Sequence, residues 1–198
     1  MQDPTDDGRA DEPDTANAPI GDDPGAVAAT VADAGTTMTV ADAACFPVEV
    51  ETLWDAISDP AAIAGCVPGA REIERLDEGR YGVTITRGVS HLTLSLSGEL
   101  AFVESSPPDY LVASGAGHDA TTGSDLAMLA AMELSPVAEP AAREGVPDDA
   151  DAAVELAYSA EVGLTGGVAS LGTEMLRPIV KRDVTAFFGN LRGRVTRR

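Results

Sequence analysis

Residues 91–103 read H-L-T-L-S-L-S-G-E-L-A-F-V, with an apolar side chain at nearly every second position. Because successive side chains of a β-strand point to opposite faces, this pattern predicts a strand that is buried on one face only. The same period recurs at 154–164, 126–134 and 81–85. Strands of this kind, joined by short turns, are typical of an antiparallel sheet with one covered face and one wet face.

Three further, shorter strands are predicted at 39–46, 70–76 and 109–117. Turn-forming residues at 77–79 and 105–109 separate neighbouring strands. The chain therefore has about seven strands, and their apolar face must be covered by helices.

Two segments carry the helical period. Residues 48–65 predict a helix that breaks at Asp59-Pro60 and continues as a short second helix over 61–65. Residues 167–195 predict a long C-terminal helix that Pro178 should bend. The predicted order is one strand, two short helices, six strands and a long helix, which is an α+β fold.

Charge is the most uneven feature of the composition. The 198 residues include 33 Asp and Glu against 13 Lys and Arg, for a formal charge of −20, and Lys181 is the only lysine. Nucleic-acid binding is excluded, because it depends on basic residues that neutralise phosphates. The imbalance resembles the composition of proteins from salt-loving archaea, whose hydrated acidic surfaces keep them soluble.

Length and cysteine content place the protein in a broad class. A chain of this length forms one ordinary domain, with or without a tail. No apolar run approaches the roughly 18 residues of a membrane span, and the first 20 residues lack the apolar core of a secretory signal. Two cysteines, Cys45 and Cys66, form neither a disulfide framework nor a metal cage, although a redox pair stays open. We expect a reducing cytoplasmic location.

Residues 1–37 differ from the rest of the chain. They are acidic, contain four prolines, and have no aromatic side chain. Too little apolar surface is present to offset the entropy of ordering, so we predict a disordered tail followed by one domain over 38–198. Translation that begins at Met38 is a second interpretation, which N-terminal mass spectrometry of the native protein tests.

Two stretches resemble a known family. Residues 46–70 read F-P-V-E-V-E-T-L-W-D-A-I-S-D-P-A-A-I-A-G-C-V-P-G-A, and residues 166–176 read G-G-V-A-S-L-G-T-E-M-L. Together they resemble the opening and the terminal helix of the carbon monoxide dehydrogenase G-subunit (CoxG) family, in the START-like (SRPBCC) superfamily. The resemblance extends over nearly all of 39–195, and an acidic loop at 136–151 is longer than the family usually has.

The resemblance implies a helix-grip fold, in which a curved sheet wraps around a long helix and leaves a cavity. It implies an accessory protein that is not an enzyme and has no covalent cofactor, with a quinone or a lipid bound in the cavity. The implied partner is a molybdenum-containing carbon monoxide dehydrogenase, which the protein would serve in membrane attachment, maturation or electron delivery. The location would then be cytoplasmic or peripheral on the inner face of the membrane.

Apolar residues at inward-facing positions are the candidates for lining such a cavity. Adaptable methionines and small alanines would leave room for a flat or chain-like ligand such as a quinone, although ordinary core is the better explanation of each single residue. The predicted ligand-binding residues are Trp54, Ile57, Val67, Leu96, Phe102, Met128, Met132, Tyr158, Leu171, Met175 and Ile179.

Few residues offer catalytic chemistry. His91 lies on the polar face of its predicted strand, and His118 lies in a turn. A metal site from His118, Asp119 and Asp125 matches no ligand spacing, and no nucleophile elbow or phosphate-binding loop is present. The alternatives are a polyketide cyclase-like enzyme, for which Tyr158 is the only expected interior hydroxyl, and an interaction protein with a filled core.

The C-terminus reverses the sign of the charge. Residues 177–198 hold seven basic side chains and one acidic side chain, for a net charge of +6. Basic residues at a helix C-terminus complement its dipole, which is sufficient to explain the last turn. The alternative is docking to acidic lipid head groups or to an acidic partner. The predicted contact residues are Lys181, Arg182, Arg192, Arg194, Arg197 and Arg198.

Overall fold

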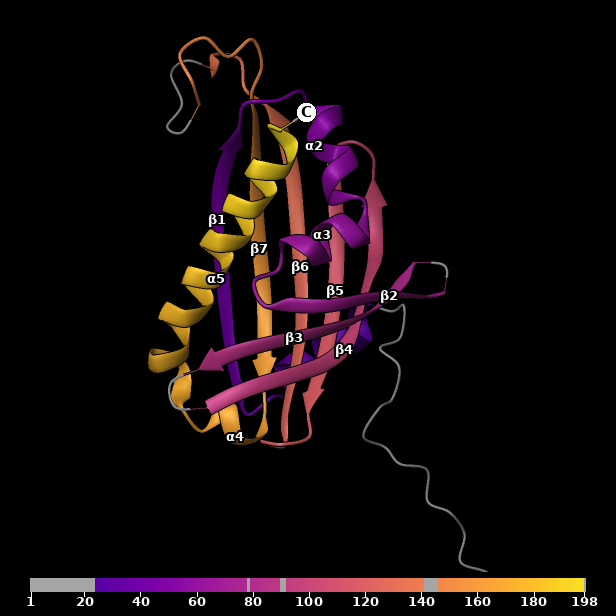
Figure 1. The fold of residues 1–198 in the computed structure, drawn as a ribbon, viewed down its shortest axis with the longest axis vertical. Coiled ribbons are helices and arrows are strands. Elements are labelled where there is room, and N and C mark those ends of the chain that lie inside the picture. The colour runs from indigo at the N-terminus through magenta and orange to yellow at the C-terminus, as the bar shows by residue number, and fades with distance from the viewer. Residues whose placement is uncertain (1–23, 78, 90–91, 141–145, 198) are drawn as a thin grey trace, which may run out of the picture.

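A computed structural model describes residues 24–77, 79–89, 92–140 and 146–197 (Figure 1). His91 therefore lies outside the described residues. The elements in chain order are α1 (Pro24–Ala32), β1 (Thr36–Phe46), α2 (Val50–Ile57), α3 (Pro60–Cys66), β2 (Ala70–Asp77), β3 (Arg80–Val89), β4 (Leu92–Ser106), β5 (Tyr110–Asp119), β6 (Ser124–Pro136), β7 (Val154–Leu164), α4 (Gly166–Ala169) and α5 (Gly172–Val195).

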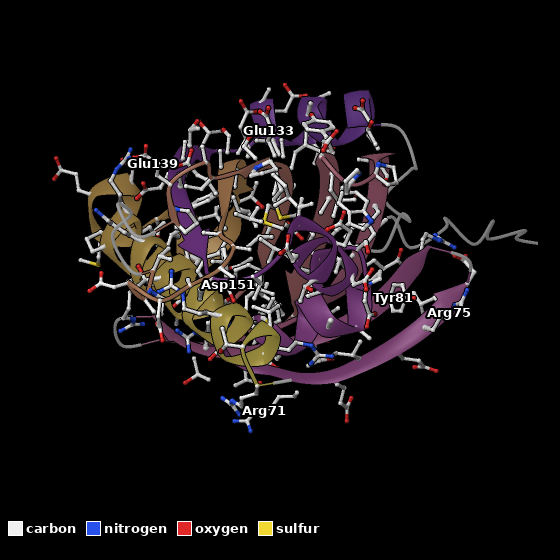
Figure 2. All side chains as sticks on the ribbon, turned by 90° about the horizontal axis from the view of Figure 1, so that it is seen from above. Arg71, Arg75, Tyr81, Glu133, Glu139 and Asp151 are labelled. Atoms are coloured by element: carbon white, nitrogen blue, oxygen red, sulfur yellow. The ribbon has the colours of Figure 1, made fainter. Side chains whose placement is uncertain are left out.

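The strands form one antiparallel sheet in the order β1-β7-β6-β5-β4-β3-β2. The predicted strands are confirmed, and most are longer than the sequence pattern indicated. Edge strand β2 exposes every residue from Arg71 to Asp77, and the side chains of Arg71 and Arg75 lie along it (Figure 2). Charged side chains on an exposed edge hinder pairing with other chains.

The sheet is strongly curved, and β4 takes part in both of its halves. In Figure 1, β2 and β3 cross the direction of β5, β6 and β7. Gly98 lies in β4 opposite Gly117, and a Cβ at Gly98 would overlap the carbonyl oxygen of Ala116. Only glycine fits there, because the two backbones approach each other so closely.

Three helices cover the concave face of the sheet. Helix α5 lies along β1 and β7, while α2 and α3 cover the end of the sheet nearest the C-terminus (Figure 1). Asp59 accepts a hydrogen bond from the N–H of Ala61 at 3.0 Å, which caps α3 and explains the break before it. The prediction of one continuous helix over 167–195 is wrong at its start, because Gly172 has φ +73° and separates α4 from α5.

Helix α1 lies on the convex face, against β6 and β7. Val31 is buried there, and Gly163 of β7 gives it room, since a Cβ at Gly163 would lie 2.9 Å from the Val31 Cα. The prediction of disorder is therefore corrected for residues 24–37, whose stabilising contact with a distant strand has no signature in local composition. Residues 1–23 lie outside the described residues.

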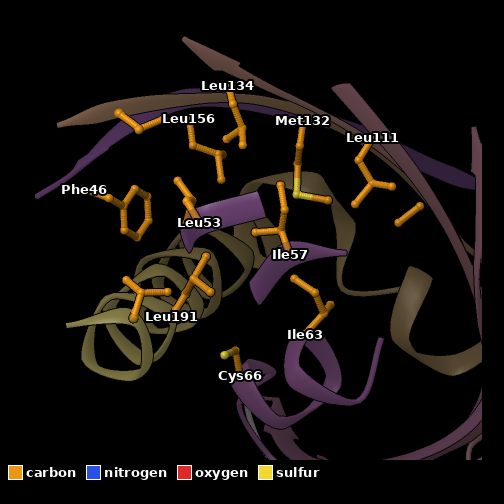
Figure 3. Close-up of a cluster of buried hydrophobic side chains, with 13 residues drawn as sticks. Phe46, Leu53, Ile57, Ile63, Cys66, Leu111, Met132, Leu134, Leu156 and Leu191 are labelled. Carbon is orange, nitrogen blue, oxygen red and sulfur yellow. The ribbon is translucent and has the colours of Figure 1, made fainter. Parts of the chain in front are cut away.

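Two clusters of buried apolar side chains hold the concave side together. The first core cluster (Figure 3) consists of Phe46, Leu53, Ile57, Ile63, Cys66, Leu111, Ala113, Met132, Leu134, Val154, Leu156, Leu191 and Val195. The second core cluster consists of Met38, Leu94, Val162, Leu164, Val168 and Leu176. Among the helices of the described residues, none is long and apolar enough to cross a membrane.

Candidate functional site

Between the two core clusters, some apolar side chains on the concave face are only partly buried. The strand register places them in line with cluster residues, yet they pack in neither cluster and stay partly exposed. We call this group the open stretch, and its members are Val40, Val83, Ile85, Leu96, Ala130 and Ala160.

Small side chains create the open stretch. Ala130 pairs with Ala160 across β6 and β7. On each strand, the inward-facing residues on both sides of the alanine are larger and pack in or against a cluster. Gly115 of β5 also lies on the concave face, and the Met128 methyl group is 3.5 Å from the position that a Cβ would take there. The open stretch therefore carries less side-chain volume at Ala130 and Ala160 than the clusters on either side of it.

The predicted ligand-binding residues fall into four groups, according to where their side chains pack. Leu96 belongs to the open stretch, and Val67 is the partly buried C-cap of α3. Ile57 and Met132 are buried in the first core cluster, where Trp54, Phe102 and Tyr158 pack partly exposed against them. The residues that pack partly exposed against the second core cluster are Met128, Leu171 and Ile179.

Met175 is a correction. Its side chain is 49% exposed, so it does not line the interior. The prediction placed Met175 on one helical stripe with Val168, Leu171 and Ile179. In the structure α5 begins only at Gly172, and Leu176 takes the inward position. Val40, Ala130 and Ala160 were missed as site residues, although the alternation over 126–134 and 154–164 includes both alanines. The alternation of Val83 and Ile85 was also visible in the sequence.

Tyr158 connects the open stretch with the first core cluster. Its ring lies 4.6 Å from the ring of Phe188, centroid to centroid, and Phe188 in turn contacts Phe46. Burial raises the pKa of the Tyr158 hydroxyl, and the negative charge of Asp42 raises it further. The hydroxyl therefore stays protonated and can donate a hydrogen bond at neutral pH.

An ion pair lies between β3 and α5, beside the open stretch. Arg87 donates from Nε to Oδ2 of Asp183 at 3.1 Å, and its Nη2 contacts the second carboxylate oxygen. Both side chains are about three-quarters buried. This pair joins the helix to the part of the sheet that curves over it.

His118, Asp119 and Asp125 do not form a metal site. His118 Nδ1 lies 2.7 Å from Oδ1 of Asp125, and Thr165 donates to the other oxygen of Asp125. Asp119 is buried and accepts hydrogen bonds from three backbone N–H groups, of which that of Ser95 contributes most to lowering its pKa. Within the described residues, no three His, Cys, Asp or Glu side chains are placed to hold a metal.

The predicted contact residues in and after α5 divide into two kinds. Lys181, Arg182, Arg194 and Arg197 are exposed, whereas Arg198 lies outside the described residues. The expectation for Arg192 is corrected, because it donates to the carbonyl oxygen of Cys45 at 2.5 Å and lies 5.5 Å from the Phe46 ring centroid. It therefore fastens α5 to β1.

Both cysteines are free thiols in the structure. Cys45 is partly buried, and Cys66 is buried in the first core cluster. Burial raises the pKa of the Cys66 thiol, and the positive charge of Arg194 offsets part of that rise. A protonated, buried thiol is a poor nucleophile.

A curved antiparallel sheet gripping a long C-terminal helix defines the helix-grip class, as predicted. Solved structures share this fold. A conserved protein from Geobacillus kaustophilus superposes with a TM-score of 0.69 at 18% identity, covering 80% of this chain and 95% of that chain. The Zhui aromatase/cyclase from Streptomyces sp. R1128 gives a TM-score of 0.55 at 15% identity, covering 82% of this chain and 95% of that chain.

Residues 46–137 match the family model of CoxG, the G-subunit family of carbon monoxide dehydrogenase. Over these residues the match agrees with the family resemblance seen in the sequence. No curated protein matches the chain. The solved structures are too distant in sequence to show more than the fold, so function has to be argued from the site.

Proposed function

We propose that the protein binds an apolar ligand, a quinone or a lipid chain, over the open stretch between the sheet and α5. The observation that supports this proposal is the group of partly exposed apolar side chains on the concave face that pack in neither core cluster. Covering apolar surface is favourable by about 25 cal/mol per Å². An apolar ligand would therefore gain binding free energy by covering the apolar surface that the protein leaves partly exposed.

We further propose that the protein acts as an accessory of a molybdenum-containing carbon monoxide dehydrogenase, in membrane attachment, maturation or electron delivery. The family match supports this partner. The exposed Lys181, Arg182, Arg194 and Arg197 offer a basic surface on an otherwise acidic protein, which suits peripheral contact with acidic lipids or an acidic partner. The location would be the cytoplasm or the inner face of the membrane.

Native mass spectrometry of protein gently extracted from its own cells tests the ligand. A co-purifying quinone or lipid is expected. The proposal would be overturned by protein that carries no ligand and whose Trp54 fluorescence does not change when quinones or lipids are added. Trp54 is the only tryptophan and packs at the first core cluster, so its signal is unambiguous.

Liposome flotation tests the basic surface. Truncating α5 is unsuitable, because Leu191 is fully buried. A variant with Arg194→Gln and Arg197→Gln should float less with acidic vesicles than the unaltered protein, and neutral vesicles serve as the control. Equal flotation of both proteins would contradict membrane contact through this end of α5.

A second candidate is an enzyme of the aromatase/cyclase type. It is favoured by the protonated Tyr158 hydroxyl on the concave face and by the structural likeness to the Zhui enzyme. Turnover of a linear polyketide that is lost in Tyr158→Phe would support this candidate. Binding without turnover would favour the accessory role.

A further inference from the structure

Arg87 places a cation at the border of the open stretch. It follows Ile85 on the concave face of β3, and its cross-strand neighbour is the buried Leu94. Gly69 has φ +83°, and a Cβ there would lie 2.6 Å from the Arg87 Cδ. The aliphatic part of Arg87 thus fills the space over Gly69, which fixes the direction of its guanidinium group.

The ion pair with Asp183 leaves part of that group available. A guanidinium group carries five N–H donors, and Asp183 engages the edge formed by Nε and Nη2. Within the described part of the chain, no acceptor is bonded to Nη1. The second edge can therefore bind a planar or tetrahedral anion through two parallel hydrogen bonds.

The surrounding charge favours an anion. Asp183 is the acidic group that faces Arg87, and Arg182 also approaches it, with Nε 3.5 Å from Oδ1. Two cations and one carboxylate leave this contact positive within a chain of net charge −20. An acidic ligand would therefore be attracted to this region.

We propose that Arg87 binds the acidic head group of a single-chain amphiphile, a carboxylate or a phosphate, whose apolar chain lies over the open stretch. This inference rests on the proposed ligand site and specifies which class of lipid it selects. Arg87 and the open stretch are adjacent on one face, so one molecule with a polar end and an apolar chain can contact both.

Displacement of a neutral fluorescent dye by palmitic acid, hexadecyl phosphate and hexadecanol tests the proposal. These ligands share a chain and differ in the head group. The unaltered protein should bind at least one of the two acids about tenfold more tightly than the alcohol, which corresponds to about 1.4 kcal/mol. The tighter acid identifies the head group as carboxylate or phosphate.

Arg87→Met should abolish the preference for the acid and leave hexadecanol binding unchanged. Arg87→Lys keeps the charge but loses the paired donors, so it should retain part of the preference and provides a test if Arg87→Met is unstable. Arg177→Met removes an exposed charge from α5 and should keep the full preference. A parallel loss of acid and alcohol affinity in Arg87→Met, or no acid preference in the unaltered protein, would overturn the inference. Failure of all three ligands to bind would instead contradict the proposed lipid site itself.

Discussion

The first core cluster and the open stretch lie on the same face of the same strands, yet one is closed and the other is not. Phe46, Leu156 and Leu191 in the cluster are fully buried, while Ala130 and Ala160 one or two rows away remain partly exposed. The difference arises from what covers each region. Helices α2 and α3 and the end of α5 cover the cluster. In the open stretch, the small side chains of Ala130 and Ala160 fill less space. The closed core and the proposed ligand site thus occupy separate parts of one sheet face.

Leu191→Ala should give the largest effect on stability. Leu191 is completely buried in the first core cluster, so its removal leaves a cavity and should lower the free energy of unfolding by about 3 kcal/mol. Met175→Ala on the same helix is the control, and its exposed side chain should change stability by no more than about 0.5 kcal/mol. Urea unfolding measures both. Equal losses of unfolding free energy in the two variants would show that Leu191 is no more buried than the exposed surface of α5.

Gly98→Ala tests the curvature that shapes the open stretch. The added methyl group overlaps the Ala116 carbonyl oxygen, so the strands must separate and the free energy of unfolding should fall by about 2 kcal/mol. Gly88→Ala in β3 is the matched control, because nothing lies within 4 Å of its Cβ position. Comparable stability of the two variants would contradict the close approach of β4 and β5.

Low pH should reduce the stability of the fold by a smaller amount, through Asp119 at the end of β5. Hydrogen bonding, led by the Ser95 N–H, lowers the folded-state pKa of Asp119 below its unfolded value. Its contribution to stability is therefore present above about pH 4 and is lost as pH falls through the folded-state pKa. Asp119→Asn should lower the melting temperature at neutral pH and reduce the further loss in acid. An unchanged pH dependence in this variant would show that Asp119 makes no such contribution.

The strands were predictable because each carries its own two-residue period. Segments 91–103 and 154–164 needed no tertiary information, and Asp59-Pro60 marked the helix break. Helix α1 was not predictable in this way. Its stabilisation comes from Gly163, which is more than a hundred residues away in the sequence. A composition argument about residues 1–37 could not include that contact.

The candidate site was predictable in outline only. Large apolar residues such as Met132 and Ile57 attracted attention, but the structure buries them as core. Two members of the open stretch, Ala130 and Ala160, are small residues whose importance comes from the side-chain volume that they leave unfilled. The pairing of Arg87 with Asp183 joins positions 96 residues apart and depends on the curvature of the sheet. No spacing rule within one strand or helix reveals it.

A pair of substitutions on β7 tests the central claim most directly. Ala160→Phe fills the open stretch, whereas Ala157→Phe adds the same side chain to the exposed convex face of the same strand. Lipid or quinone binding is measured by titration, and unfolding in urea confirms that both variants are folded. Ala160→Phe should lose binding at least tenfold while its free energy of unfolding changes by less than about 1 kcal/mol, and Ala157→Phe should bind normally. Unchanged binding in Ala160→Phe would contradict a ligand site over the open stretch.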